Sequence, residues 1–255
     1  MGLFDNNDQP FGPITEDNQT WMPQDGVDFE TWQKNRFGTK SGEPLEDPEW
    51  INYYCGCDLG KRIDFSCLVI LQLKTAPNGS NHLDVVHIKR WRLDTSYKSI
   101  ASKLARIDGM LHGKAAAQGK KCDPVWVVDR GSIGDAVLEM IAETMPNAEV
   151  WGGVITGGES KPRFDYGNRV VTSPKRELVS AVTAALSAER LHFPKKYNPE
   201  VEALIQEMLD FEVKASQSGH ESFNGKTGSH DDQVVALSLA TVLSLTLKDR
   251  ELHMW

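Results

Sequence analysis

Acidic residues stand at three points of the chain where an apolar segment begins or ends. Asp58 follows the apolar run that starts at Tyr53, and Asp129 ends the run PVWVVD. Asp231 and Asp232 open an apolar segment that continues as QVVALSLA. Carboxylate oxygens are the hard ligands that Mg²⁺ and Mn²⁺ prefer. If the fold brings the three positions together, these acids can hold divalent metal.

A pair of divalent ions about 4 Å apart hydrolyses phosphodiesters by activating the attacking water and stabilising the leaving oxygen. Carboxylates packed for this purpose repel one another, so without metal at least one of them has a raised pKa. Each acid also has a simpler interpretation by itself. Asp58 is typical of a turn before Gly60, Asp129 of a helix N-cap, and Asp231-Asp232 of acids at a helix N-terminus. Only their combination favours a site.

The elements that must position these acids are predicted from apolar periodicity. Strands are expected over residues 52–58, 65–73 and 83–93, with Asn78-Gly79 as a hairpin signal before the third. These three form an antiparallel meander. Helix and strand patterns then alternate, with a helix at 97–112, a strand at 124–128, a helix at 131–145 and a strand at 148–155.

The second half of the chain begins with a polar, basic segment, 156–170, which we expect to be a loop. Ser173 is expected to cap a helix with Pro174 at its first position, running to about Arg190. The remaining predictions are an extended piece at 191–193, a helix at 199–210, a hairpin at 211–226 and a buried helix at 231–247.

This order of elements predicts an α/β fold with a mixed sheet, a three-strand antiparallel meander plus parallel strands, flanked by helices on both faces. With an acid on the first strand, it is the ribonuclease H-like plan. Residues 1–50 are rich in Pro, Gly, Asp and Asn. We expect them to be an N-terminal arm or linker with a short helix around 29–36, and residues 51–255 to be the folded domain.

Composition narrows the class of protein. The 255 residues carry a formal net charge of −8, so bulk electrostatics does not make the chain a strong nucleic-acid binder. Contact with a polyanion needs a local basic patch, bridging metal ions or a tethering partner. The four Cys lack zinc-site spacing and are expected to be free thiols in a reducing compartment. With no membrane-length apolar run and no secretory signal, we expect a cytosolic protein.

Four segments resemble the nuclease domain of the large terminase subunit of tailed bacteriophages. They are CDLGKRIDFSCLVIL at 57–71, VWVVDRGSIGDAVLEMI at 125–141, SPKRELVSAVTAALSAERLHFP at 173–194 and HDDQVVALSLA at 230–240, the last being the most specific. The resemblance covers about residues 51–245. It implies a metal-dependent endonuclease that cuts concatemeric phage DNA during genome packaging, in the host cytoplasm.

The resemblance also implies roles for particular residues. Asp58, Asp129 and Asp232 would ligate a two-ion Mg²⁺ or Mn²⁺ site, Asp231 would be an alternative or additional ligand, and His230 would contact a ligand or a phosphate. The implied partners are double-stranded DNA, an ATPase motor, the small terminase subunit and the portal. The motor must be a separate chain or region, because the sequence contains no G-x-x-x-x-G-K-[ST].

DNA contact must be local in a chain of this charge. Asp64, at the start of the second strand, could assist Asp58, although a solvated turn acid is the simpler interpretation. No base-reading motif is present, so we expect little sequence preference. Basic residues beside the acids and in the loop after 155 are candidate phosphate contacts: Lys61, Arg62, Arg130, Lys161, Arg163 and Arg169.

Three other functions remain open at this point. A Holliday-junction resolvase-like nuclease shares the plan and differs in preferring junctions to linear duplex. An actin- or sugar-kinase-like ATPase is indicated by Asp58-Leu59-Gly60, but it needs a second phosphate loop and a duplicated domain. A packaging adaptor with a nuclease-like fold would need none of the acids. Acids at all three positions favour the nuclease.

Overall fold

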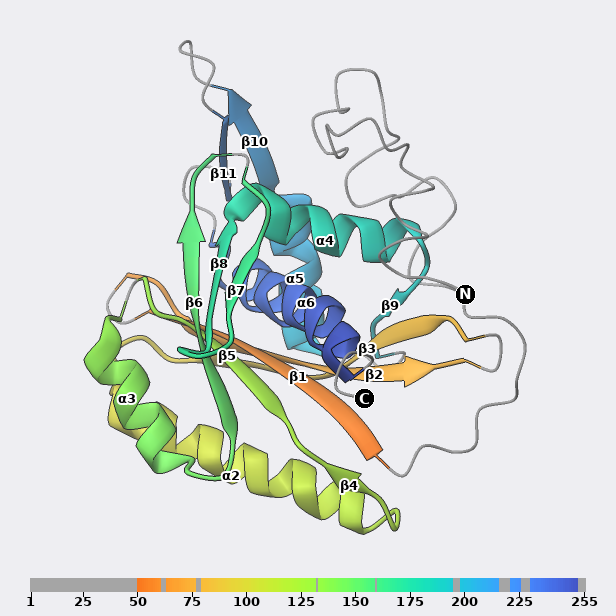
Figure 1. Ribbon diagram of the computed structural model, residues 1–255. Helices are drawn as coiled ribbons and strands as arrows, with labels where there is room; N and C mark the ends of the chain where they lie inside the picture. The colour runs from red at the N-terminus through yellow and green to blue at the C-terminus, as the bar shows by residue number, and fades with distance from the viewer. Residues whose placement is uncertain are drawn as a thin grey trace.

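The computed structural model describes residues 50–60, 63–76, 79–131, 133–158, 160–194, 198–215, 221–225 and 230–251. Nine of the described strands build one mixed sheet in the order β7-β8-β6-β5-β1-β2-β3-β9, with β4 paired to β1 (Figure 1). The predicted arm over 1–49, with its short helix, lies outside the described residues. None of the described helices is long and apolar enough to cross a membrane.

The predicted antiparallel meander is confirmed. It consists of β1 (Trp50–Leu59), β2 (Ser66–Thr75) and β3 (Asn81–Trp91). The β1–β2 register pairs Cys57 with Leu68, and a bulge interrupts the β2–β3 pairing between Ile70 and Leu71. Most of β1 and the first six residues of β2 are buried, as central strands with apolar runs should be.

The parallel half of the sheet lies beside β1. β5 (Val125–Asp129) pairs with β1, β6 (Glu149–Thr156) with β5, and β8 (Val170–Pro174) with β6, all parallel. The two short strands β4 (Lys121–Cys122) and β9 (Leu191–His192) pair parallel with β1 and β3. Parallel neighbours end at the same edge, so the carboxyl ends of β1, β5, β6 and β8 lie together.

The prediction of a loop over 156–170 is wrong. The segment contains β7 (Arg163–Asp165) and leads directly into β8, to which β7 pairs antiparallel. The sequence did not predict β7 because it is a short edge strand with one apolar residue, Phe164, and no alternation of apolar and polar residues marks it as a strand. The N-cap prediction is also wrong: Ser173 belongs to β8, and Pro174 caps the helix that follows.

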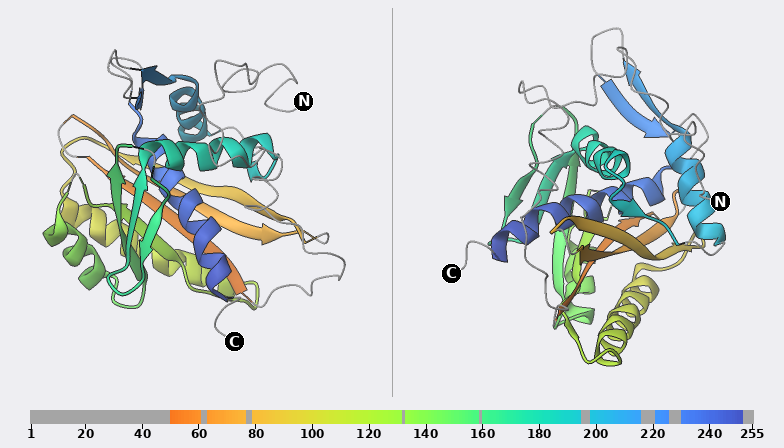
Figure 2. Two further views of the ribbon diagram at one scale, coloured as in Figure 1. Left: turned by 45° about the horizontal axis from the view of Figure 1, so that its top comes forward. Right: turned by 90° about the vertical axis from the view of Figure 1, so that its right-hand side faces the viewer.

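Helices cover both faces of the sheet, as predicted. On one face lie α2 (Tyr97–Ala116) and α3 (Asp135–Thr144). On the other lie α4 (Lys175–Ser187), α5 (Pro199–Leu209) and α6 (Asp232–Glu251). Figures 1 and 2 show α6 lying across the sheet with α4 beyond it. Each face has its own apolar cluster, so the sheet is buried on both sides. The helix expected at 131–145 begins later, after Gly134 with φ 75°.

α6 lies unusually close to β1, and Gly56 is the reason. A Cβ at this position would lie 1.9 Å from the backbone oxygen of Ala236 and 2.9 Å from the nitrogen of Ala240. Only a residue without a side chain allows this approach. The contact places the start of α6 beside the carboxyl end of β1.

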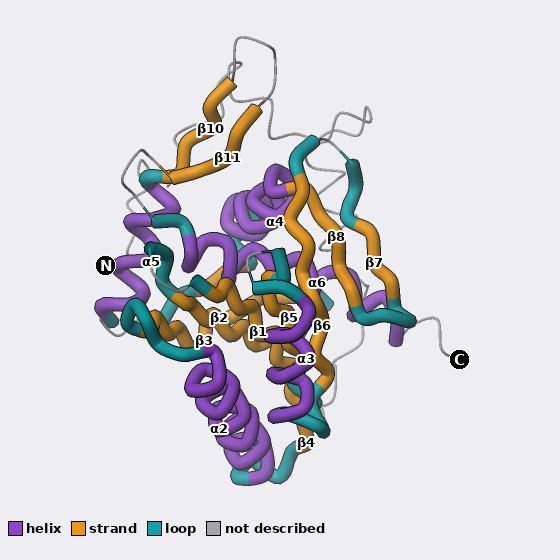
Figure 3. Tube along the Cα trace, turned by 90° about the vertical axis from the view of Figure 1, so that its left-hand side faces the viewer, coloured by secondary structure: helices purple, strands orange, loops and turns teal. Residues whose placement is uncertain are grey.

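The predicted hairpin after α5 is confirmed as β10 (Phe211–Ala215) and β11 (Glu221–Gly225), paired antiparallel. In Figure 3 it stands beyond α4 and α5, separate from the main sheet. Its tip at 216–220 and the segment 226–229 lie outside the described residues.

Candidate metal centre

Asp58 and Asp129 stand side by side at the carboxyl ends of adjacent parallel strands. Cys57 pairs with Val128, so the two acids come next in the same register. Cys57 and Val128 point into the core under α2 and α3. Because side chains alternate along a strand, Asp58 and Asp129 point to the opposite face, which α4 and α6 cover.

The four predicted acids influence one another electrostatically. Burial raises the pKa of Asp58 well above its usual value, and the charges of Asp129, Asp232 and Asp231 raise it further. Burial also raises the pKa of Asp129, although its Oδ1 accepts a hydrogen bond from the Gly131 N–H at 2.9 Å, which lowers that pKa. The fold therefore brings together acids from β1, β5 and the start of α6.

Lys175 is a cation that interacts with several acids of this cluster. It is the first residue of α4, and its Nζ lies 2.7 Å from Oδ2 of Asp231. Its charge also lowers the pKa of both Asp58 and Asp129. Sequence reasoning missed this residue, although a signal existed: a lysine in the first turn of a helix opposes the macrodipole unless acids lie nearby.

A tight turn after β1 brings a further acid to Asp232. The Gly60 N–H donates to the Phe65 carbonyl at 3.2 Å, and a Cβ on Gly60 would lie 2.1 Å from the Asp64 carbonyl oxygen. The Phe65 N–H then donates to Oδ2 of Asp232 at 3.3 Å. The turn therefore needs glycine, and it holds Asp64 and Phe65 against the start of α6.

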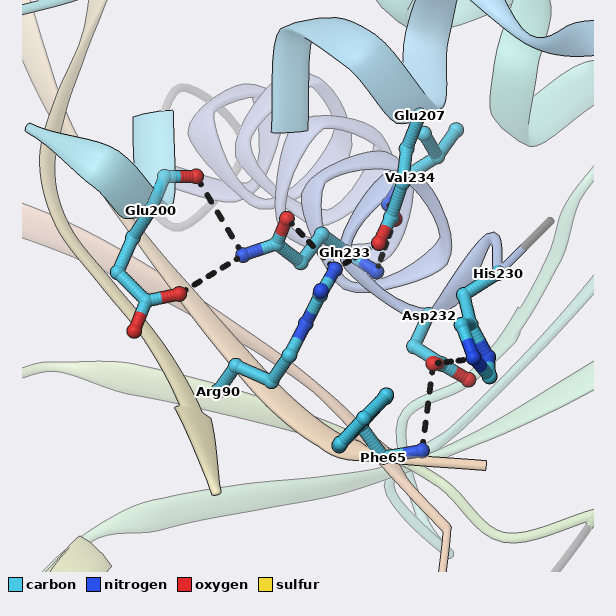
Figure 4. Close-up of polar contacts among 8 residues, drawn as sticks. All are labelled: Phe65, Arg90, Glu200, Glu207, His230, Asp232, Gln233 and Val234. Carbon is cyan, nitrogen blue, oxygen red and sulfur yellow. Dashed lines mark hydrogen bonds and ion pairs between the residues drawn. The ribbon is translucent and has the colours of Figure 1, made fainter. Parts of the chain in front are cut away.

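Asp64, His230 and Asp232 each offer a ligand atom, and these atoms lie within 4.8 Å of one another. In the part of the chain that the structure describes, no other group of three such side chains comes so close. His230 Nδ1 lies 3.6 Å from Asp232 Oδ2, and its ring meets the Phe65 ring edge-on at 4.9 Å (Figure 4). Asp58 and Asp129 are not members of this tighter set, and Asp64, which was expected to lie near Asp58, is grouped with Asp232.

Asp232 is the most buried of these acids, with 5% of its surface exposed. Burial raises its pKa to about 6, the Phe65 N–H and His230 lower it, and Asp64 and Asp231 raise it. A buried carboxylate among like charges is held at a free-energy cost that a divalent cation would remove. The donors are carboxylate oxygens and one imidazole, so their chemistry fits such an ion.

The predicted phosphate contacts are only partly brought to this edge. Arg130 lies beside Asp129, with its Nη2 paired to Asp135 at 3.0 Å. Exposed Arg163 pairs in register with Thr172, near the end of β8 that leads to Lys175. Arg169 precedes β8 and lies two residues before Val171, which is level with Asp129 through Gly153. Lys161 is exposed in the loop before β7, and Lys61 and Arg62 lie outside the described residues.

No family model and no curated protein sequence matches the chain. Among solved structures, it is similar to the large terminase nuclease from thermophilic phage G20c, with TM-score 0.52, 15% identity, and coverage of 82% of this chain and 95% of that chain. The human cytomegalovirus terminase nuclease domain, Mn soaked and inhibitor bound, matches with TM-score 0.51, 10% identity and coverage of 86% and 96%. The chain has the fold of a terminase nuclease domain.

The predicted fold class, a ribonuclease H-like mixed sheet covered by helices, is confirmed by this similarity to terminase nuclease domains. The G20c nuclease with bound magnesium also matches, with TM-score 0.50, 17% identity and coverage of 82% and 94%. The described terminase-type sheet of this chain carries Asp58 and Asp129 at its carboxyl edge, with α4 and α6 starting there.

Proposed function

We propose that this chain is a divalent-metal-dependent endodeoxyribonuclease of the terminase type, which cuts concatemeric phage DNA during genome packaging. The observation that carries the proposal is the position of Asp58. Its carboxylate lies at the carboxyl edge of a terminase-type sheet and interacts with Asp129, Asp231 and Asp232. The similar structures include the G20c nuclease with bound magnesium and the cytomegalovirus domain soaked with Mn, which supports a divalent cofactor.

In this proposal Asp58 and Asp129 would hold one ion, and Asp232, with Asp64 and with Asp231 as an additional ligand, would hold the other. Divalent ions at such a site lower the pKa of a bound water and stabilise the charge of the leaving oxygen. The protein's own contribution is to orient the carboxylates, and the charge of Lys175 favours the ionised forms of Asp58 and Asp129. Lys175 supplies a positive charge beside Asp231 and can contact the substrate phosphate once metal neutralises that acid.

The substrate is double-stranded DNA, bound through local contacts because the chain is acidic overall. Arg130, Lys161, Arg163 and His230 are proposed phosphate contacts on the described part of the chain, and Lys61 and Arg62 are proposed with them. An ATPase motor, the small terminase subunit and the portal would present the DNA in the host cytoplasm.

Cleavage of supercoiled plasmid by the purified chain tests this function. Nicked and linear products are expected with Mn²⁺ or Mg²⁺, and none with EDTA. A four-way junction offered beside a linear duplex of equal length tests the resolvase alternative, which predicts selective cutting of the junction. Intact plasmid with both metals would overturn the proposal.

Mn²⁺ should raise the melting temperature more at about pH 7.5 than at about pH 5. The pKa of Asp232 is raised to about 6 in the folded protein, and that of Asp58 is also raised. At pH values between the unfolded-state pKa and the folded-state pKa of each acid, the folded protein therefore binds more protons than the unfolded chain. Metal-free stability from these groups is therefore lost as pH rises through about 6, and metal has most to restore above it. Thermal unfolding with and without Mn²⁺ measures this. Equal shifts at both pH values would contradict it.

Lys175→Met should lower kcat/KM for plasmid cleavage by about ten- to a hundredfold. It should also move the acid limb of the pH profile to higher pH, because Lys175 lowers the pKa of Asp58 and Asp129. Lys98→Met is the matched control, since Lys98 is an exposed lysine in the first turn of α2. A Lys175→Met enzyme with the wild-type pH profile would remove Lys175 from the site.

A further inference from the structure

Behind Asp232 lies a polar network inside the molecule. Arg90 of β3 forms an ion pair with Glu207 of α5, and its Nη2 also donates to Oε1 of Gln233 at 3.0 Å (Figure 4). Glu207 and Gln233 have 6% and 0% of their surface exposed. The three residues come from separate elements that meet at the start of α6.

Stability alone does not explain this network. Burying an ion pair costs desolvation free energy, and well-packed apolar residues often replace such pairs with no loss of stability. The burial of Glu207 raises its pKa to about 7, although Arg90 and two backbone N–H groups oppose the shift. Arg90 Nε is in addition buried without a hydrogen-bond partner. Because this ion pair is costly to bury, we expect its role to lie in the parts of the protein that Arg90 and Glu207 hold in position.

Glu207 holds the backbone of α6. Its Oε2 accepts hydrogen bonds from the Gln233 N–H at 2.9 Å and the Val234 N–H at 3.4 Å. These are among the first N–H groups of a helix, which have no partner within the helix itself. Asp232 is the first residue of α6, so a carboxylate from α5 caps the helix immediately after the proposed metal ligand.

Arg90 also reaches the carboxylate end of Asp232 through Phe65. The guanidinium carbon lies 5.1 Å from the centre of the Phe65 ring, and the Phe65 N–H donates to Asp232 Oδ2 at 3.3 Å. Figure 4 shows Arg90 between Gln233 and Phe65, with Asp232 beside both. Arg90, which is partly buried, therefore contacts both Glu207, which holds the backbone that follows Asp232, and Phe65, whose N–H holds the Asp232 side chain.

We propose that Arg90 and Glu207 are positioning residues that orient the Asp232 carboxylate for metal binding. This inference rests on the proposed function, because it assigns Asp232 to the metal site. Partners that orient metal ligands matter for affinity more than for folding, and their loss typically weakens metal affinity or activity about 10- to 100-fold.

The double variant Arg90→Met/Glu207→Leu separates positioning from folding. Its melting temperature in EDTA should fall, because the Gln233 and Val234 N–H groups lose their acceptor, so metal binding is measured well below the melting transition of the variant. Its dissociation constant for Mn²⁺, measured by calorimetry, should rise about 10- to 100-fold. Plasmid cleavage should need correspondingly more Mn²⁺ and recover at high Mn²⁺.

Single variants keep the test decisive if the double variant does not fold. Glu207→Gln retains an acceptor oxygen for the Gln233 and Val234 N–H groups but loses the charge that pairs with Arg90, so an intermediate rise in the Mn²⁺ dissociation constant is expected. Glu202→Gln, an exposed position on the same helix, is the control and should bind Mn²⁺ like wild type.

The outcomes distinguish the two proposals. Wild-type protein that neither binds Mn²⁺ nor cleaves DNA would overturn the proposed function, and this inference with it. Wild-type protein that binds Mn²⁺, alongside folded Arg90 and Glu207 variants with the same dissociation constant, would overturn the positioning role alone.

Discussion

Asp58→Asn should reduce DNA cleavage by about 10³-fold or more and, at the same time, make the metal-free protein more stable at neutral pH. Activity falls because the asparagine amide is a poor ligand for a divalent ion at the centre of the acidic cluster. Stability rises because burial and three neighbouring acids raise the pKa of Asp58, so its ionised form is disfavoured in the folded protein. Opposite signs for activity and stability mark a functional carboxylate.

The sign of the stability effect depends on pH. The folded-state pKa of Asp58 is raised, so the carboxyl group destabilises the metal-free protein above that pKa and not below the unfolded value of about 4. The gain from Asp58→Asn should therefore be present at about pH 7.5 and vanish at about pH 4. Thermal unfolding in EDTA and plasmid cleavage in Mn²⁺ measure the two effects.

Asp123→Asn is the matched control for this prediction. Asp123 is an exposed acid just before β5, at the opposite end of the strand that carries Asp129. Neither cleavage nor melting temperature should change in this variant. An Asp58→Asn protein that cleaved plasmid at the wild-type rate would exclude Asp58 from the catalytic site.

Gly56→Ala should lower the free energy of unfolding by about 3 kcal/mol or more, the upper range for overpacking a core. The new Cβ would lie 1.9 Å from the Ala236 backbone oxygen, and two backbone segments cannot yield as a flexible side chain can. α6 would have to move away from β1 and take Asp232 with it. Urea unfolding measures the stability, and an Mn²⁺ titration measures the consequence for the site.

Gly113→Ala tests whether the loss at Gly56 is specific. Gly113 is an exposed residue of α2 with no atom within 4 Å of an added Cβ. Alanine there should stabilise the helix by about 0.5–1 kcal/mol. If Gly56→Ala were as stable as wild type, the close approach of α6 to β1 would not be the constraint inferred from the structure.

Local pattern was sufficient for the framework of the fold. The apolar runs of β1, β2 and β5 are predicted from sequence because both faces of a central strand are buried. Edge strand β7 and its neighbour β8 were missed, because pairing between strands with few apolar residues is decided by the rest of the sheet.

The candidate acids could also be selected from sequence, since Asp58, Asp129 and Asp231-Asp232 stand where apolar segments end or begin. The contacts that each acid makes could not be predicted from sequence. Lys175, 56 residues from Asp231 in sequence, reaches it only because β8 ends beside the start of α6. The type of a residue determines which chemistry its side chain can do, whereas the distance between two charged side chains depends on how the chain folds.

By itself, then, the sequence determined a mixed sheet covered by helices on both faces, and three places where acids could face a common edge. Tertiary structure alone decided that Lys175 joins those acids, that Asp64 and His230 lie with Asp232, and that Arg90 and Glu207 stand behind it. The physical reason is that strand register and the approach of α6 over Gly56 are set by packing across the whole molecule, and these set the distances on which metal binding depends.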